Sequence, residues 1–483
     1  MHREPVALAT SIVRNSAALM AVGLLAKGMG LVIAVLVARF LGPTGMGLFA
    51  LLYSVALLIE LVTPLGLQDV LIREVATHPK SRVTLWKSAT RLALTASIAP
   101  ALGFLVAAWF YREDASIRLA LMTLAIGMPC SALALVSQAV LQGMERILYI
   151  TWTSFLARVA SLMALILMLM QGMGVEAAFM SRVMFQAGAA ALFIWLILRD
   201  PPDHAAAAHP GISLARTLPF AFNRVLSESA VRAPLLLLPI LFALSDIGLF
   251  DAADRVRLTL GIMVAVATTG IMPALARASA SGWDERHALV SFGAKYVCLI
   301  ISAAALGISI FADLIVRVLY GPKFAESALL LQVLIWTQVL VGTDAVLKQA
   351  MIASGREYAV VARSLAGLVA LAILVVALGY AFGLIGAAVG VLTAASVTLA
   401  LDARFVARQS PTFELRRFLL GPLACAAVAG AVLLALNGAP LLLRLAAGIA
   451  TYALAALAVK LLPRRERGFL RDTMLHGLGR KKT

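Results

Sequence analysis

Long apolar runs constrain this chain more than any other feature of its sequence. Near the N-terminus, residues 16–38 and 45–65 form two such runs, joined by the tight turn Leu41-Gly42-Pro43-Thr44-Gly45. A helix crosses a bilayer with about 20 mainly apolar residues, and each run is that long. Similar runs follow along the chain, of which 62% is hydrophobic and only 13% charged. We therefore expect an integral membrane protein of helices, since aromatic residues are too sparse for the alternating pattern of a membrane barrel.

The length of the chain allows about fourteen transmembrane helices. One break in composition interrupts them, where two prolines and polar residues follow Arg199. Prolines in a polar context end a helix and indicate a linker. The expected organisation is an N-terminal lobe of six helices at residues 1–198, a cytoplasmic linker at 199–212, a C-terminal lobe of six helices at 213–407, two further helices at 408–463 and a basic tail at 464–483.

The chain has a formal net charge of +17, and the distribution of its basic residues predicts the topology. Basic residues gather in short loops on alternate sides of the predicted spans, which is the positive-inside pattern and not the continuous stripe of a nucleic-acid interface. Both termini are therefore expected in the cytoplasm, and no nucleic acid is expected as a partner. The three cysteines lie far apart in apolar spans, so they predict neither a metal site nor a redox motif.

An internal repeat relates the two predicted lobes. Gly47-Leu48-Phe49-Ala50 opens the second span, and Gly248-Leu249-Phe250-Asp251 opens the eighth. Because six spans separate the copies, both halves start on the same side of the membrane, which is the parallel type of transporter repeat. The pattern predicts two facing six-helix lobes with the substrate route between them.

Ionisable residues inside the predicted spans are the candidate site residues, because charge at that depth needs a partner or water. Arg224, Glu228 and Arg232 fall four apart on one face of the seventh span. Since arginines outnumber the nearby acids, we expect a cationic cavity, which would suit a pyrophosphate through paired hydrogen bonds. The candidate substrate-binding residues are Arg224, Arg232, Arg158, Arg182, Asn223, Arg255 and Arg257.

Other charged residues in the spans are expected to pair or to bind a coupling ion. Lys27 and Glu60 are the predicted structural pair between the first two spans, since intramembrane charges pair by default. Asp344 and Lys348 are expected to form a local pair one helical turn apart. Asp251 and Asp254, three apart on one face, are the candidates for a coupling cation.

Several motifs resemble those of polysaccharide-export flippases. At the start of the chain they are Arg39-Phe40-Leu41-Gly42, Gly45-x-Gly47-Leu48-Phe49, Leu65-Gly66-Leu67 and Arg73-Glu74-Val75-Ala76; later they are Leu319-Tyr320-Gly321-Pro322-Lys323-Phe324 and Ala353-Ser354-Gly355-Arg356. The individual motifs are short, and their order carries the specificity. This family is part of the group of multidrug, oligosaccharidyl-lipid and polysaccharide exporters, so the resemblance implies a MATE-like fold of two pseudo-symmetric lobes.

The resemblance also implies a function. A protein with this function is a flippase, which moves a polyprenyl-(pyro)phosphate-linked oligosaccharide from the inner to the outer leaflet of the bacterial cytoplasmic (inner) membrane, by alternating access of the two lobes. The expected partners are that lipid-linked oligosaccharide and membrane lipids, and a partnership with polysaccharide polymerase machinery stays open. No cofactor or metal is expected, while coupling to a proton or sodium gradient stays open.

Two alternative functions remain. One is a cation-coupled multidrug antiporter of the same superfamily. The other is a membrane glycosyltransferase or polymerase, which would need paired carboxylates on a sizeable outer loop, whereas Glu113-Asp114 lies on a short one. The sequence contains no nucleotide-binding loop, metal-ligand spacing or nucleophile constellation, so we expect no enzyme.

Overall fold

The computed structural model describes the backbone of residues 5–62, 67–111, 113–199, 226, 228–281, 283–409, 415–436 and 438–458, and side chains for all of these except 5–27, 62, 262, 265–281, 283–289, 415–417 and 441–442. The helices of the first part are α1 (Pro5–Val62), α2 (Leu67–Thr77), η1 (Pro79–Ser81), α3 (Arg82–Phe110), α4 (Ala115–Gly143), α5 (Ile147–Met170) and α6 (Val175–Arg199). A helical stretch at 228–237 and the short η2 (Leu238–Ile240) precede α8 (Leu244–Ser281). The remaining helices are α9 (Trp283–Ile310), α10 (Ala312–Tyr320), η3 (Pro322–Phe324), α11 (Ser327–Leu334), α12 (Thr337–Ala353), α13 (Glu357–Gln409), α14 (Leu415–Ala435) and α15 (Leu441–Ala458).

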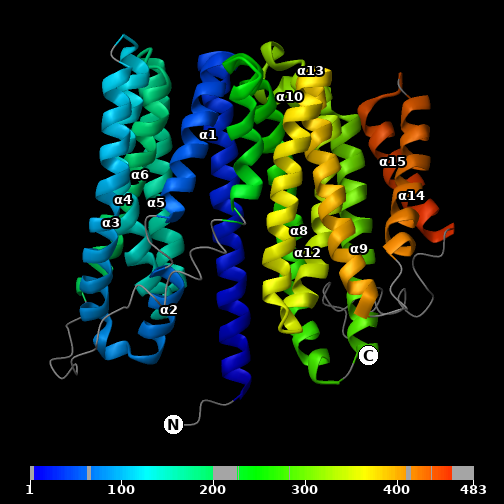
Figure 1. The fold of residues 1–483 in the computed structure, drawn as a ribbon, viewed down its shortest axis with the longest axis horizontal. Coiled ribbons are helices and arrows are strands. Elements are labelled where there is room, and N and C mark those ends of the chain that lie inside the picture. The colour runs from blue at the N-terminus through cyan, green and yellow to red at the C-terminus, as the bar shows by residue number, and fades with distance from the viewer. Residues whose placement is uncertain are drawn as a thin grey trace. The chain divides into compact units, whose positions relative to one another are not determined.

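Two of these helices, α1 and α13, each consist of two helical legs joined at a bend, and the legs of α1 match the two predicted spans (Figure 1). The bend in α1 lies at Gly42, with φ of 69°, and the bend in α13 lies at Gly383, with φ of 66°. Only glycine adopts such left-handed angles without a steric penalty. The predicted turn at residues 41–45 is therefore confirmed.

The apolar segment before α13 forms two helices in place of one continuous span. α11 and α12 are separated at residues 335 and 336, and the segment before them contains α10 and η3. Among the described residues, nine helical segments are long and apolar enough to cross a membrane. The chain is thus a multi-pass, all-helical membrane protein.

The structure divides into two compact units. Unit 1 comprises Met1–Thr259, Val316–Ser327 and Ser364–Val391, and unit 2 comprises Leu260–Ile315, Ala328–Arg363 and Leu392–Thr483. These units do not follow the predicted lobe boundary, and the linker at 200–212 lies outside the described residues. The division into two six-helix lobes stays a prediction.

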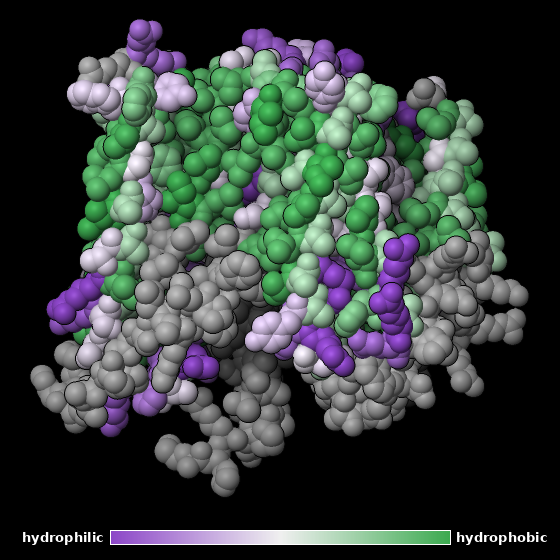
Figure 2. All heavy atoms as spheres, in the orientation of Figure 1, coloured by the Kyte–Doolittle hydropathy of each residue, from purple (hydrophilic) through white to green (hydrophobic). Residues whose placement is uncertain are grey.

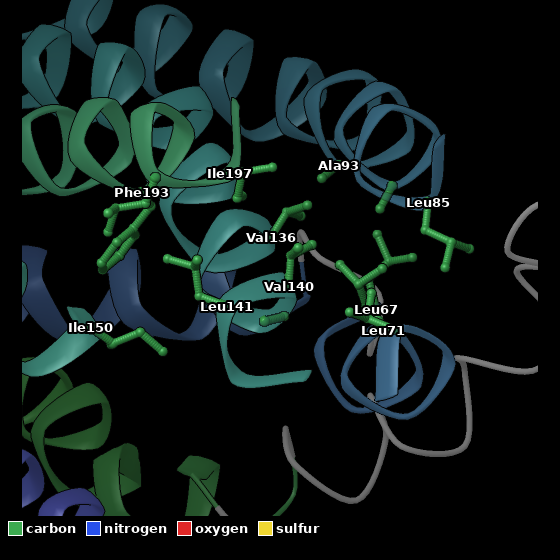
Figure 3. Packing of buried hydrophobic residues seen from close by; sticks show 14 of the residues in the cluster. Leu67, Leu71, Leu85, Ala93, Val136, Val140, Leu141, Ile150, Phe193 and Ile197 are labelled. Carbon is green, nitrogen blue, oxygen red and sulfur yellow. The ribbon is translucent and has the colours of Figure 1, made fainter. Parts of the chain in front are cut away.

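The core of unit 1 lies among α2, α3, α4, α5 and α6, where large side chains alternate with alanines. Figure 3 shows Leu71 of α2 near Val140 of α4, and Leu141 of α4 toward Phe193 of α6. In lipid the apolar surroundings give helices little hydrophobic reason to associate, so close packing has to supply the stability. The alanines permit that close approach.

In unit 1, α1 and α8 cross where the two copies of the repeat motif meet. A Cβ atom on Gly47 would lie 1.8 Å from the carbonyl oxygen of Leu244, and a Cβ atom on Gly248 would lie 1.9 Å from the carbonyl oxygen of Pro43. Each glycine thus packs against the residue four positions before the other glycine. This reciprocal contact is the intramolecular counterpart of a two-fold interface, in which equivalent patches contact each other.

In unit 2, α9 packs against α12 and α14, and α14 packs against α15. Leu299 and Leu306 of α9 contribute to a core with Leu433 of α14 and Tyr452 of α15. The Tyr452 hydroxyl donates to the Leu299 carbonyl at 2.8 Å, which ties α15 to α9.

The outer surface of the helices is apolar in both units. Figure 2 shows hydrophobic residues over most of the visible described surface, with hydrophilic residues gathered toward helix ends. Trp152, Ile126 and Ile449 are 69%, 62% and 71% exposed. Such exposure of large apolar side chains is expected where lipid is the solvent.

Candidate functional site

The second leg of α1 presents an aromatic and acidic face in unit 1. Phe49 and Tyr53 are four residues apart, with ring centroids 5.4 Å apart, and Glu60 follows two turns later. Residues at these spacings share one side of a helix. Glu60 is only 8% exposed, so its charge needs a partner.

Two residues of α6 supply that partner. The Arg182 guanidinium forms an ion pair with Glu60 through Nη2 and Oε2, and Gln186 Nε2 donates to Glu60 Oε1 at 3.0 Å. Arg182 and Gln186 are one turn apart, so they reach the same carboxylate. The Lys27 side chain lies outside the described residues, and the predicted Lys27–Glu60 pair stays a prediction; the described partner of Glu60 is Arg182.

Three arginines from three separate segments meet at the ring of Tyr53. The guanidinium carbons of Arg182, Arg232 and Arg255 lie 4.5, 5.7 and 5.6 Å from its centroid. Arg255 also lies 5.1 Å from the ring of Phe49 and donates from Nε to Asp251 Oδ2 at 2.6 Å. The Tyr53 cluster, as we define it, consists of Phe49, Tyr53, Glu60, Arg182, Gln186, Arg232, Asp251 and Arg255.

The Tyr53 cluster contains more positive than negative groups and several unused donors. Its three guanidinium groups face two carboxylates. Arg182 Nε, Arg232 Nε and Arg255 Nη2 are buried and have no hydrogen-bond acceptor among the described residues. Buried donors are normally paired, because leaving one unpaired costs about 1–3 kcal/mol. Donors of this kind suit an anion with several oxygens, which guanidinium groups bind through paired hydrogen bonds.

The other predicted arginines lie in different surroundings. Arg257 is 6% exposed and donates from Nε to Asp254 Oδ1 at 2.6 Å. These two residues form a buried ion pair on α8, the helix that also carries Asp251 and Arg255 of the Tyr53 cluster. Arg158 of α5 stacks on the ring of Phe185 at 3.7 Å and interacts electrostatically with Arg182. The predicted residues Asn223 and Arg224 lie outside the described residues.

The candidate coupling carboxylates each have an arginine partner. Asp251 pairs with Arg255 and Asp254 with Arg257. Asp251 and Asp254 are 0% and 2% exposed. Their role in binding a cation stays a prediction, and their described contacts are those of structural ion pairs.

Two motifs that suggested the family lie in contact within unit 1. Arg39 donates from Nε to the carbonyl oxygen of Leu319 at 2.7 Å and from Nη2 to that of Val318. These carbonyls belong to the last turn of α10, where helix carbonyls lack intrahelical partners. A basic side chain there also complements the helix dipole.

Sequence reasoning missed the aromatic side of the site. Tyr53 and Phe49 stand in an apolar run, and the available signal was their spacing of four residues, with Glu60 two turns beyond Tyr53 on the same side of the helix. Gln186 gave no signal of its own, because its role depends on a carboxylate of another helix.

The comparisons with known proteins support both fold and family. A structure titled "Lipid II flippase MurJ, inward closed conformation" matches with a TM-score of 0.71 and 13% identity, covering 96% of this chain and 100% of that one. An inward-facing multidrug resistance MATE family transporter of the MOP superfamily matches with a TM-score of 0.65 and 15% identity, covering 84% and 100%. A MOP superfamily transporter from Pyrococcus furiosus matches with a TM-score of 0.59 and 14% identity, covering 83% and 96%.

At these identities the structures establish the fold, and it is the expected MATE-like one. No curated protein matches the sequence. The model of the polysaccharide biosynthesis protein family matches residues 12–279, a segment that includes the repeat motifs and every residue of the Tyr53 cluster. Because this match extends over more than half of the chain, the protein belongs to the polysaccharide biosynthesis protein family, and its helices have a MATE-like fold.

Proposed function

We propose that this protein is a flippase that moves a polyprenyl-(pyro)phosphate-linked oligosaccharide from the inner to the outer leaflet of the bacterial cytoplasmic membrane. The observation that carries the proposal is the Tyr53 cluster, where three buried guanidinium groups each leave one N–H without an acceptor among the described residues. A pyrophosphate offers several oxygens and a negative charge that does not cross hydrocarbon unaided.

The residues of the cluster take different roles in this proposal. Arg182 is held by Glu60 and Arg255 by Asp251, which fixes their planes beside Tyr53. Arg232 forms no ion pair within the described part of the chain, so nearby Asp251 offsets only part of its charge and the rest can act on the anion. Arg224, two turns earlier on the same predicted face, would extend the positive surface, with Arg158 adding further potential from α5.

The charge of the cluster also discriminates against the main alternative. A multidrug antiporter of the MATE type shares the fold, but a site for cationic drugs needs an excess of carboxylates. The described cluster has an excess of guanidinium groups. We therefore rank lipid-linked anion transport above cation export.

A depletion strain tests the function. We expect loss of surface polysaccharide and accumulation of the lipid-linked oligosaccharide on the inner leaflet, measured by mass spectrometry of extracted lipids together with leaflet-selective labelling. Normal surface polysaccharide after depletion, in a strain without a second flippase, would exclude the role. Unchanged polysaccharide combined with new sensitivity to cationic drugs would instead support the antiporter.

Site variants then test the cluster. Arg232→Ala should reduce transport sharply at normal protein level, and Arg232→Lys should restore it only partly, because lysine keeps the charge and loses the planar fork. Arg199→Ala is the matched control, since Arg199 is exposed and stacks on Trp195 at the end of α6. If Arg232→Ala transports as well as Arg199→Ala, the cluster is not the anion site.

A further inference from the structure

A second buried charged cluster lies in unit 2, on α12 and α13, and the proposed transport site does not use it. Lys348 Nζ lies 2.8 Å from Asp344 Oδ2, which confirms the predicted local pair, and 3.8 Å from Asp402 Oδ2. Asp402 is also bonded to Arg363. The Asp402 cluster, as we define it, consists of Asp344, Lys348, Arg363 and Asp402.

Arg363 of this cluster has three partners, whereas Lys348 is partly exposed and has one close partner. Arg363 donates from Nε to Asp402 Oδ1 at 2.5 Å and from Nη2 to Met351 Sδ at 3.0 Å, and its guanidinium carbon lies 3.8 Å from the ring centroid of Phe405. The side chain of Lys348 is 26% exposed and ends in a compact ammonium on a flexible stem. Any rearrangement of the cluster should therefore involve Lys348.

One oxygen of each carboxylate lacks a hydrogen-bond donor. Asp402 is fully buried and Asp344 is 6% exposed, yet Asp402 Oδ2 and Asp344 Oδ1 accept no hydrogen bond from any described residue. The ammonium of Lys348 reaches hydrogen-bonding distance of only one carboxylate. Arg363 and Lys348 match the two carboxylates in number, but the Lys348 ammonium lies within 4 Å of both carboxylates, and neighbouring carboxylates raise each other's affinity for a proton. A bound proton would turn one of them into the donor that the pair lacks.

We propose that Asp344 and Asp402 form a proton-binding carboxyl pair. Hydronium of the solvent transfers one proton to a carboxylate oxygen, so that an O–H bond forms, water is left, and the resulting acid donates to the other carboxylate. The positive charge gained weakens the hold on Lys348, which turns toward its exposed side. The inference is independent of the transported substrate.

The described surroundings favour a proton over a metal ion. Among the residues with described side chains, no group of three or more histidine, cysteine, aspartate or glutamate side chains is placed to hold a metal. Hard cations take about six or more oxygen ligands, and two basic groups already occupy this cluster. Other charged residues of α13 and of the turn before it are exposed: Arg356, Glu357, Arg404 and Arg408. On α9, which packs against α12, Lys295 stacks on Tyr296 at 4.9 Å.

Infrared difference spectroscopy of the full-length protein in lipid nanodiscs tests the proposal. On acidification the wild type should gain the carbonyl stretch of a buried carboxylic acid, identified by its slow exchange in deuterated water. Asp344→Asn and Asp402→Asn should each abolish this band, while the control Glu357→Gln should keep it. A band that persists unchanged in both folded asparagine variants overturns the proposal.

A second pair of variants covers the case in which the asparagine variants do not fold, since Asp402→Asn leaves Arg363 without its carboxylate. Asp344→Glu and Asp402→Glu keep the charge and should shift the band instead of removing it. Folded glutamate variants with an unshifted band overturn the proposal. The proposal is also overturned if the carboxylate bands do not change on acidification but do change when sodium replaces choline at constant pH. That result would assign the pair to a metal cation.

Discussion

The crossing of α1 and α8 gives the most direct test of the structure. In Gly47→Ala the new methyl group would lie 1.8 Å from the carbonyl oxygen of Leu244, far inside van der Waals contact. Overpacking costs about 1–3 kcal/mol where side chains can give way, and here the obstacle is backbone, so we expect about 3 kcal/mol. Gly103→Ala is the matched control, because a Cβ there meets nothing within 4 Å and alanine favours a helix over glycine by about 1 kcal/mol.

The reciprocity of the contact makes the prediction sharper. If the two helices move apart to accommodate one methyl group, they also make room for the other. The losses in free energy of unfolding for Gly47→Ala and Gly248→Ala should therefore be non-additive, with the double variant losing clearly less than the sum of the two single variants. Gly47→Ala combined with Gly390→Ala should be additive, since a Cβ on Gly390 would instead meet the carbonyl oxygen of Leu374 at 2.7 Å, within α13.

The assay is unfolding by sodium dodecyl sulfate in mixed micelles, followed by far-ultraviolet circular dichroism of purified variants. The free energies of unfolding of the single and double variants form a double-mutant cycle. A Gly47→Ala variant as stable as Gly103→Ala, or a Gly47/Gly248 pair that is strictly additive, would refute the described crossing.

Two further predictions concern the interior of unit 1. Arg182→Ala should cost about 3–5 kcal/mol by leaving Glu60 buried without its partner, whereas Arg182→Met with Glu60→Met should recover much of the loss in the same unfolding assay; equal instability of the single and double variants would contradict the pairing. Leu141→Ala should cost about 2–5 kcal/mol, because Leu141 is fully buried and the cavity cannot collapse completely; Leu167→Ala, at a side chain 58% exposed, should stay close to the wild type.

Much of the architecture follows from local sequence properties. Apolar length predicts membrane helices, and the glycine and proline of residues 41–45 predict the bend at Gly42, because both features depend on a single stretch of chain. The repeat motif predicts that equivalent segments exist in two halves, and the order of short motifs indicates the family. The pair Asp344–Lys348 was predictable for the same reason, since one turn of helix brings the two side chains together.

Only the tertiary structure decides which charges meet across helices. Periodicity shows that Glu60 and Arg182 each need a partner, but spans of similar hydropathy do not reveal which helices are neighbours. The contact of three arginines with Tyr53, and of Asp402 with Arg363 and Lys348, joins residues far apart in the chain. The sequence by itself determined a helical membrane protein whose predicted spans contain more arginines than nearby acids. The packing of α1, α6 and α8 decided where those arginines converge. Side-chain partners in a helical bundle depend on the position and rotation of each helix, and no local sequence pattern contains that information.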